Sequence, residues 1–361
     1  METVTAAYVP TDEDFRLKSN AGEIGIDTNF ASQNFWKDVL IRFFKKKSAV
    51  IGLIFIVLIT VMVIIGPGMT PYTYSEQNLS QKNLAPRVAS LEKLGIFDGS
   101  ESISTTSGSK KMNYYVEKGL DNVYYWFGSD NFGRDIWTRT WSGAKVSLII
   151  AVAAALIDMI IGMSYGLISG YFGGKVDLIM MRIVDIIYSL PDMLIIILLS
   201  VVFNETLKPL ITGTVLEKLG TNMISMFIVF GLLYWVSMAR LIRGQILSIK
   251  NNEYVLAARC IGTKNARILR RHILPNCLSV IIITTALQVP SAIFTESYLS
   301  FLGLGVSAPL TSLGSLANDA RAGMQSYPLR LVIPAIAICL IVLALNLLGD
   351  GLRDAFDSKL N

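Results

Sequence analysis

Charge is scarce in this sequence of 361 residues, and so are the side chains that most enzymes use for chemistry. Asp, Glu, Lys and Arg make up 16% of it, whereas a soluble chain has roughly a quarter. There is one histidine, His272, and the three cysteines, Cys260, Cys277 and Cys339, are scattered. A zinc site needs several nitrogen or sulfur ligands, and a disulfide framework needs paired cysteines. We therefore expect no catalytic residue, no metal site and no cofactor.

Glycine-rich loops that bind phosphate are also missing. The segment from Ser169 to Val176 (SGYFGGKV) approaches a P-loop, but a serine replaces its first glycine and a valine replaces its hydroxyl residue. The segment from Gly303 to Ala308 (GLGVSA) imitates a dinucleotide fingerprint without following a strand. The excess of Lys and Arg over Asp and Glu is small, 32 − 27 = +5. We expect the chain neither to bind ATP by itself nor to bind nucleic acid.

Hydrophobic length is what the sequence has in abundance. Hydrophobic residues make up 52% of it and the mean hydropathy is +0.52. Since a transmembrane helix needs about 20 mostly apolar residues, the sequence predicts an all-α integral membrane protein with six transmembrane helices. Five or seven are the alternatives, because Gln288 and Pro290 interrupt the fifth segment. The predicted segments are Ala49 to Ile65, Val146 to Gly166, Ile186 to Phe203, Met223 to Ala239, Cys277 to Phe294 and Leu331 to Leu348.

Basic residues gather in two places, directly before the first segment and between the fourth and fifth. Loops rich in Lys and Arg stay in the cytoplasm. We therefore predict that both clusters lie there and, with an even number of spans, that both termini do too. The first cluster is Arg42, Lys45, Lys46 and Lys47, and the second is Arg240, Arg243, Lys250, Arg259, Lys264, Arg267, Arg270 and Arg271, beside the single acid Glu253.

These assignments divide the chain into a cytoplasmic N-terminal segment (1–48), transmembrane helix 1 (49–66), an extracytoplasmic loop (67–142), a transmembrane core (143–349) and a cytoplasmic tail (350–361). In the long loop, the Ser/Thr/Gly-rich residues 99–111 are expected to be flexible and residues 114–126 to form a small hairpin. Apolar residues at helical spacing before the first segment predict an amphipathic helix in the membrane interface, or else an extension of the first span. They are Phe35, Trp36, Val39, Leu40, Phe43 and Phe44.

Three glycines, Gly162, Gly166 and Gly170, recur at every fourth position of the second segment. Small residues on one face let another helix approach closely, so these glycines predict helix packing. The alternative is that glycine is simply commoner in membrane helices.

Acids inside membrane segments are costly and usually face a bundle interior or a water-filled path. Asp158 and Asp192 are such acids, and Asp185 lies nearer the end of its segment. Because Pro191 precedes Asp192, we expect the helix to be kinked or loosened there. We interpret Asp192, Pro191 and Gln288 as residues of a translocation pathway. The alternative is a buried acid that pairs with a neighbour such as Arg182.

The second basic cluster lies in a loop, residues 240–276, whose part from 251 to 276 reads NNEYVLAARCIGTKNARILRRHILPN. It predicts a helix over 253–261, a stop at Gly262, a second helix capped by Thr263, and its end at Pro275. Ala257 and Ala258 make a smooth face suited to a groove on another protein. A solvated connector is the alternative.

This loop resembles the coupling loop of bacterial ABC-importer permeases, which has the pattern Glu-Ala-Ala, three residues, Gly, nine residues, Ile, one residue, Leu-Pro. Leu256 replaces the glutamate and His272 replaces the isoleucine, which puts a salt bridge of that glutamate in doubt but not docking itself. The resemblance implies that the loop contacts an ATPase. The residues of this coupling loop are Glu253, Ala257, Ala258, Gly262, Leu274 and Pro275, of which all but Glu253 match the pattern in register.

Four further stretches resemble the peptide/nickel branch of the same family and fit its C-type permease, while residues 68–125 look like a variable insert. They are RFFKKKSAVIGL (42–53), FGSDNFGRDIWTR (127–139), ESYLSFLGLGV (296–306) and NLLGDGLRDAFD (346–357).

The resemblance implies a type I ABC-importer permease fold in a bacterial cell membrane. It implies a non-catalytic half of a pore, paired in the bilayer with a homologous second permease, with two ABC ATPases and with an extracytoplasmic substrate-binding lipoprotein. Peptide is the implied cargo, with nickel or an oligosaccharide as alternatives. A secondary transporter is disfavoured because six spans show no inverted repeat, and a membrane enzyme because one histidine supplies no reactive constellation.

Overall fold

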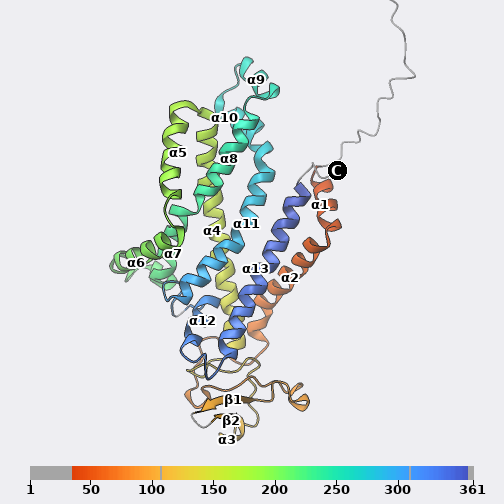
Figure 1. Ribbon diagram of the computed structural model, residues 1–361, viewed down its shortest axis with the longest axis vertical. Coiled ribbons are helices and arrows are strands. Elements are labelled where there is room, and N and C mark those ends of the chain that lie inside the picture. The colour runs from red at the N-terminus through yellow and green to blue at the C-terminus, as the bar shows by residue number, and fades with distance from the viewer. Residues whose placement is uncertain (1–34, 106–107, 309, 357–361) are drawn as a thin grey trace, which may run out of the picture.

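The computed structural model describes residues 35–105, 108–308 and 310–356, which are mostly helical (Figure 1). Six of the described helices are long and apolar enough to cross a membrane, which confirms the predicted number of spans. They are α2 (Lys47–Ile65), α4 (Ile136–Phe172), α6 (Asp192–Ile211), the run of α7 (Thr221–Leu233) and α8 (Trp235–Ile249), the run of α10 (Asn265–Ile268), the π-helix η5 (Leu269–Ile273) and α11 (Leu274–Phe301), and α13 (Leu329–Phe356).

A small domain between α2 and α4 covers one end of the bundle, here named the hairpin end (Figure 1). Leu84, Tyr115 and Tyr125 form its core. Its elements are three short 3-10 turns, η1 (Gly66–Gly68), η2 (Leu79–Gln81) and η3 (Glu92–Leu94), the antiparallel strands β1 (Ser100–Thr105) and β2 (Gly108–Asn113), and α3 (Tyr114–Glu117).

The prediction of a hairpin over residues 114–126 is wrong, while the flexibility expected of residues 99–111 stays a prediction. The stretch expected to be flexible contributes most of the two strands, and the stretch expected to form a hairpin begins with α3. The base of the hairpin is tied at Asp98, whose carboxylate accepts a hydrogen bond from the Ser100 amide (2.9 Å) and whose carbonyl accepts one from Asn113 Nδ2 (3.3 Å). These contacts leave no trace in hydrophobic patterning, so composition alone missed them.

Helix α4 begins at Ile136, ten residues before the second predicted segment. Asp135 is its N-cap, and the carboxylate accepts hydrogen bonds from the backbone N–H of Trp137 (3.4 Å) and Thr138 (3.0 Å) and from the hydroxyl of Thr70 (3.1 Å). Burial raises the pKa of Asp135, and these hydrogen bonds counteract that rise. Helix α4 therefore begins inside the stretch 67–142 that the sequence assigned to the loop.

Helix α1 (Phe35–Lys45) is a separate helix, because Lys46 between α1 and α2 has an extended backbone (φ −85°, ψ 109°). Val39 and Phe43 pack against Ala49 and Ala355 of the neighbouring helices. The remaining apolar residues expected on this helix, Phe35, Trp36, Leu40 and Phe44, stay exposed. The extension of the first span is thus wrong, while the interfacial position stays a prediction. Residues 1–34 and 357–361 of the two predicted terminal segments lie outside the described part.

The three glycines of α4 lie against α8. A Cβ on Gly162 would come within 2.7 Å of the Trp235 carbonyl oxygen, and one on Gly166 within 2.6 Å of the Ala239 carbonyl oxygen. Gly170 faces Ile246 in the same way, at 3.0 Å from its Cβ. Backbone therefore meets backbone along this contact, so α4 and α8 form one closely packed pair.

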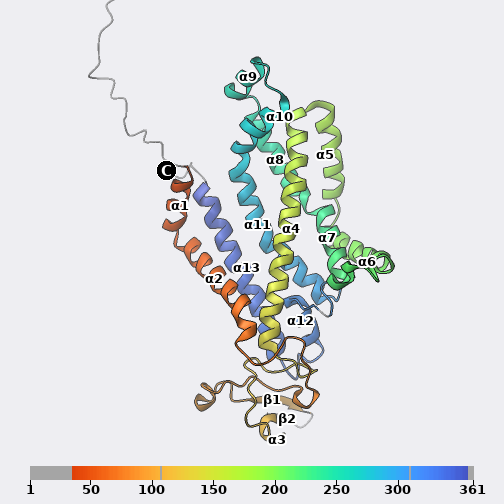
Figure 2. The same ribbon diagram turned by 180° about the vertical axis from the view of Figure 1, so that it is seen from behind.

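The opposite end of the bundle, here named the α9 end, carries α9 (Glu253–Cys260) at its tip, as both views show (Figures 1 and 2). Residues of the near-miss P-loop form the turn between α4 and α5, where Gly173 and Gly174 have φ +65° and +54°. The remaining elements are α5 (Gly174–Tyr188), η4 (Val215–Leu219) and α12 (Leu313–Arg321).

Candidate functional site

A cavity of about 310 Å³ lies among the end of α5, the start of α6, the α7–α8 junction and α11. Asp192 and Gln288, which the sequence assigned to a pathway, both line it, and Pro191 adjoins it in the chain. We name this space the Asp192 cavity. Its other polar lining residues are Tyr188, Tyr234, Ser237, Ser291 and Thr295, which sequence reasoning did not single out.

Helices α5 and α6 are two separate helices and not one bent helix. Helix α5 ends at Tyr188 and α6 begins at Asp192, with Pro191 in an extended conformation (φ −64°, ψ 108°). The third predicted span, from Ile186, is therefore wrong at its start. Because proline disfavours a helical residue before it, the break falls there. The first turn of α6 then holds Asp192, where free N–H groups favour a negative charge.

Asp192 is exposed and makes no hydrogen bond or ion pair with a residue that the structure describes. The acids of α5 are different. Asp185 pairs with Arg240 (2.6 Å), and Asp177 makes a bidentate pair with Arg243 (2.5 and 2.6 Å). The hydrogen bonds from Arg243 hold the pKa of Asp177 below its usual range. The expected alternative partner, Arg182, pairs with none of these acids.

A second intramembrane acid, Asp158, is 1% exposed on α4. Neither of its carboxylate oxygens has a hydrogen-bond partner among the described residues. It does not line the Asp192 cavity, so the two acids that the sequence grouped together have different surroundings.

Gly262 ends α9 in a left-handed conformation (φ +76°), as the sequence predicted. A Cβ at Gly262 would meet nothing within 4 Å, so glycine is favoured there by the backbone conformation and not by crowding. Thr263 is not the cap of the next helix, because Lys264 occupies the N-cap and makes no side-chain capping bond. The predicted capping role of Thr263 is therefore wrong.

One face of α9 packs on the bundle and the other is open. Val255 and Ala258 are buried, the latter 5% exposed, in a cluster with Ile246 and Ile268. The prediction that Ala258 faces another protein therefore needs correction, since Val255 and Ala258 lie three residues apart on the inward face. The open residues of α9, together with Ile261 directly after it, are Glu253, Tyr254, Leu256, Ala257, Arg259, Cys260 and Ile261, and Ile261 is 82% exposed.

Pro275 does not end the second helix of the loop. The helical run continues from Asn265 to Phe301, and Leu274 and Pro275 begin α11 directly after the π-helix. A proline inside a helix lacks an N–H and crowds the preceding turn, and a π-turn is one local adjustment that relieves this. Leu274 and Pro275 thus join the loop rigidly to a span.

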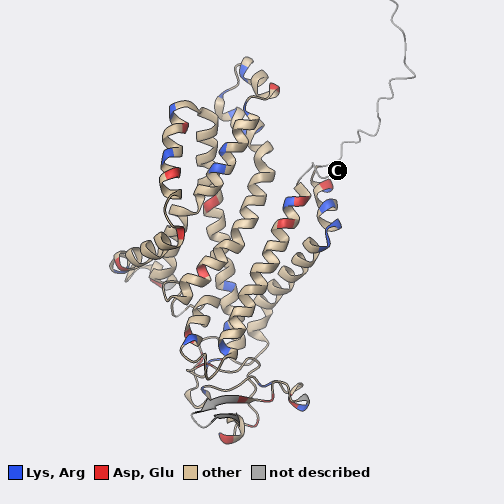
Figure 3. Cartoon of the chain, viewed as in Figure 1, with Lys and Arg blue, Asp and Glu red and all other residues tan. Residues whose placement is uncertain are grey.

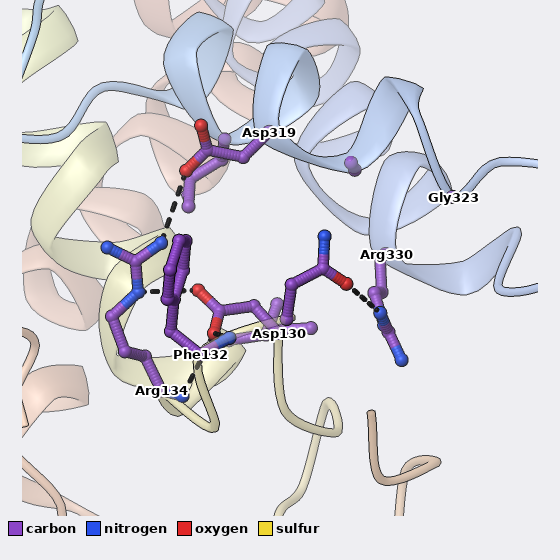
Figure 4. Close-up of a pocket in the computed structure, with 10 residues that line it drawn as sticks. Asp130, Phe132, Arg134, Asp319, Gly323 and Arg330 are labelled. Carbon is purple, nitrogen blue, oxygen red and sulfur yellow. Dashed lines mark hydrogen bonds and ion pairs between the residues drawn. The ribbon is translucent and has the colours of Figure 1, made fainter. Parts of the chain in front are cut away.

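The motif FGSDNFGRDIWTR lies at the hairpin end and lines a smaller cavity of about 80 Å³, here named the hairpin-end pocket (Figure 4). Asp130 accepts hydrogen bonds from the Phe132 and Arg134 amides and from Arg134 Nε (2.6 Å). Arg134 and Arg139 both reach Asp319 of α12, at 3.4 and 3.2 Å. The acids of this pocket are therefore paired with guanidinium groups.

The motif ESYLSFLGLGV places Glu296 at a junction of three helices, where it is 0% exposed. Its carboxylate accepts hydrogen bonds from Ser147 of α4 (2.8 Å) and from Ser300 (2.7 Å). Ser147 Oγ also accepts a hydrogen bond from the Leu313 amide at the start of α12 (3.3 Å). Through these hydrogen bonds Glu296 and Ser147 connect α11, α4 and α12, which the sequence did not predict.

Comparison with known proteins places this sequence in a family. The model of the binding-protein-dependent transport system inner membrane component matches residues 162–361, and that of the N-terminal transmembrane domain of oligopeptide transport permease C matches residues 34–86. Among solved structures, a chain of the inward-facing MetNI methionine ABC transporter aligns with a TM-score of 0.47 and 16% identity, covering 60% of this chain and 94% of that one.

Two curated relatives align over almost the whole chain. The oligopeptide transport system permease protein OppC of Bacillus subtilis is 42% identical over 91% of this chain and 91% of its own length. The dipeptide transport system permease protein DppC of the same organism is 39% identical over 97% of this chain and 93% of its own length. The resemblance stated from the motifs is confirmed, and the chain belongs to the binding-protein-dependent transport system inner membrane component family.

Proposed function

We propose that this chain is the transmembrane permease subunit of an ATP-driven ABC importer that takes up oligopeptides or dipeptides. The observation that carries the proposal is the alignment with peptide-system permeases over nine-tenths of both chains. The chain is then non-catalytic, and two partner ATPases hydrolyse ATP. A homologous second permease completes the pore as a heterodimer, and an extracytoplasmic binding lipoprotein delivers the cargo.

In this proposal the α9 end is cytoplasmic and the hairpin end is outside the cell membrane. The basic residues that precede α2 and those of the α8–α11 loop lie toward the same end of the bundle (Figure 3), which supports one cytoplasmic face. Both termini are then cytoplasmic, and the hairpin end faces the binding protein.

Coupling is assigned to α9 and the turn at Gly262. Open apolar side chains on α9 suit a groove on an ATPase. Val255 and Ala258 fasten α9 to the bundle, while Leu274 and Pro275 lead without a break into α11. A push on α9 would therefore move α11 and also the closely packed pair of α4 and α8. The Asp192 cavity, which both α8 and α11 line, would change shape in that movement.

The test is reconstitution of the permease pair with its ATPases and binding protein in vesicles. ATP-dependent uptake of a labelled oligopeptide is expected, and it should stop when ATP is removed while ion gradients are held. Uptake that follows an ion gradient without ATP would contradict the proposal in favour of a secondary transporter. Uptake of nickel or an oligosaccharide, and not of peptide, would keep the family and change the cargo.

A further inference from the structure

The Asp192 cavity carries an uncompensated negative charge. Of the residues that line it, all of which the structure describes, Asp192 is the one with a charged side chain. The Arg240 guanidinium stacks on the ring of the lining residue Tyr188, with 4.0 Å from its central carbon to the ring centroid. Since Arg240 is already paired with Asp185, it does not neutralise Asp192.

The rest of the lining suits a cation with apolar neighbours. Tyr234 offers an aromatic ring, which attracts a cation at its face, whereas the ring of Tyr188 already stacks with Arg240. Gln288 and Ser291 offer oxygen acceptors, and no described lining residue offers a charged donor to an anion. The Tyr234 hydroxyl is held by Thr295 at 2.5 Å, so this part of the wall is fixed. Leu233, Met193 and Phe294 supply apolar surface.

We propose that the Asp192 carboxylate is the subsite of this cavity that receives a primary ammonium group, namely the protonated amino terminus of a peptide. The ammonium forms an ion pair with Asp192 and hydrogen bonds with the neutral acceptors around it, and the first apolar side chain of the peptide contacts the apolar wall. A peptide carboxylate finds no cation here and is repelled. The inference rests on the proposed function for the identity of the ligand, but the charge preference belongs to the cavity itself.

The charge preference is tested without transport. The full chain, with Cys260, Cys277 and Cys339 replaced by alanine and with Ser291→Cys as a reporter, is assembled with its partners in vesicles. Modification rates are measured with a cationic and an anionic methanethiosulfonate reagent. Asp192→Asn is expected to lower the cation-to-anion rate ratio about tenfold, the order of effect of one charge at short range in a partly solvated site. Glu205→Gln, an acid of the same helix that does not line the cavity, is the matched control and should leave the ratio unchanged.

An unchanged ratio in Asp192→Asn, or a Ser291→Cys reporter that neither reagent reaches, would overturn the proposal. In the transport assay, Asp192→Asn should slow uptake of a peptide with a free amino terminus several-fold relative to its N-acetylated form. Equal slowing of both peptides would mean a structural role and would also overturn it. If the wild-type complex takes up no peptide, the proposed function fails, while the reagent ratio still decides the charge preference.

Discussion

The hairpin-end pocket and the Asp192 cavity use charge in opposite ways. At the hairpin-end pocket, Asp130 and Asp319 contact guanidinium groups, and Arg330 donates to the side-chain oxygens of Asn83 (2.7 Å) and Asn131 (2.9 Å). In the Asp192 cavity, the carboxylate is exposed and unpaired among described residues. Charged groups that pair with each other stabilise the fold, whereas an unpaired charge remains available to a ligand. The comparison predicts that substitutions at the hairpin-end pocket lower stability, while substitution of Asp192 changes transport with little effect on stability.

The largest loss of stability is expected at the hairpin-end pocket. Asp130→Ala removes the acceptor of three hydrogen bonds and leaves Arg134 and Arg139 with an excess of positive charge. We expect a loss of about 3 kcal/mol in the free energy of unfolding, measured by denaturation of the purified chain in detergent. Asp121→Ala, in the same domain but without a described side-chain contact, is the control. Equal stability of the two variants would show that the paired network contributes nothing.

A smaller stability effect, with a large functional one, is expected at the α9 turn. Gly262→Val forces a β-branched residue into a left-handed conformation at a cost of ~1–2 kcal/mol, confined to the loop. Membrane insertion should be normal, while the permease loses its ATPases or hydrolyses ATP without import. Co-purification of the ATPases, ATPase activity and uptake in vesicles measure this, and Gly244→Ala, at an open helical glycine, is the control. Wild-type coupling would show that the loop is only a connector.

The two faces of α9 should differ in the same way: substitution on the open face should affect ATPase binding, and substitution on the buried face should affect stability. Ala257→Asp, on the open face, should leave the stability within about 0.5 kcal/mol of wild type and weaken ATPase binding. Ala258→Asp places an unpaired polar group against the bundle and should cost about 2 kcal/mol. Denaturation and co-purification on both variants give the two readouts. Intact ATPase binding in Ala257→Asp would place the contact elsewhere.

The smallest stability effect is expected at Asp192. The Asp192 carboxylate has no partner among the described residues that a substitution could remove. The free energy of unfolding of Asp192→Asn should therefore lie within about 0.5 kcal/mol of wild type, while the charge preference of the Asp192 cavity changes. Asp177→Asn is the contrasting variant, since it breaks the bidentate pair with Arg243. It should be measurably less stable at neutral pH, and the two proteins should converge as the pH falls through the lowered pKa of Asp177. A destabilised Asp192→Asn would reveal a structural partner and break the comparison.

Local features of the sequence predicted much of this architecture. Each span can be recognised in the sequence as about 20 mostly apolar residues, because the bilayer requires that length whatever the span packs against. Gly262 was predictable in the same way, since a left-handed helix end depends on a few neighbouring residues. The α5–α6 break was half-predicted, because Pro191 marks a weak point but does not say whether a helix bends or ends there.

The sequence by itself determined that this chain is a six-span membrane protein of the permease family with a turn at Gly262. Tertiary structure alone decided which partner each charge finds: Asp185 meets Arg240, and Asp192 meets none among the described residues. It also decided that Ala258 turns inward while Ala257 stays open. The physical reason is range. Hydrophobic length and backbone preference act between near neighbours in the chain, whereas an ion pair, a buried face or a cavity exists only once distant segments, such as α6 and α11, have been packed together.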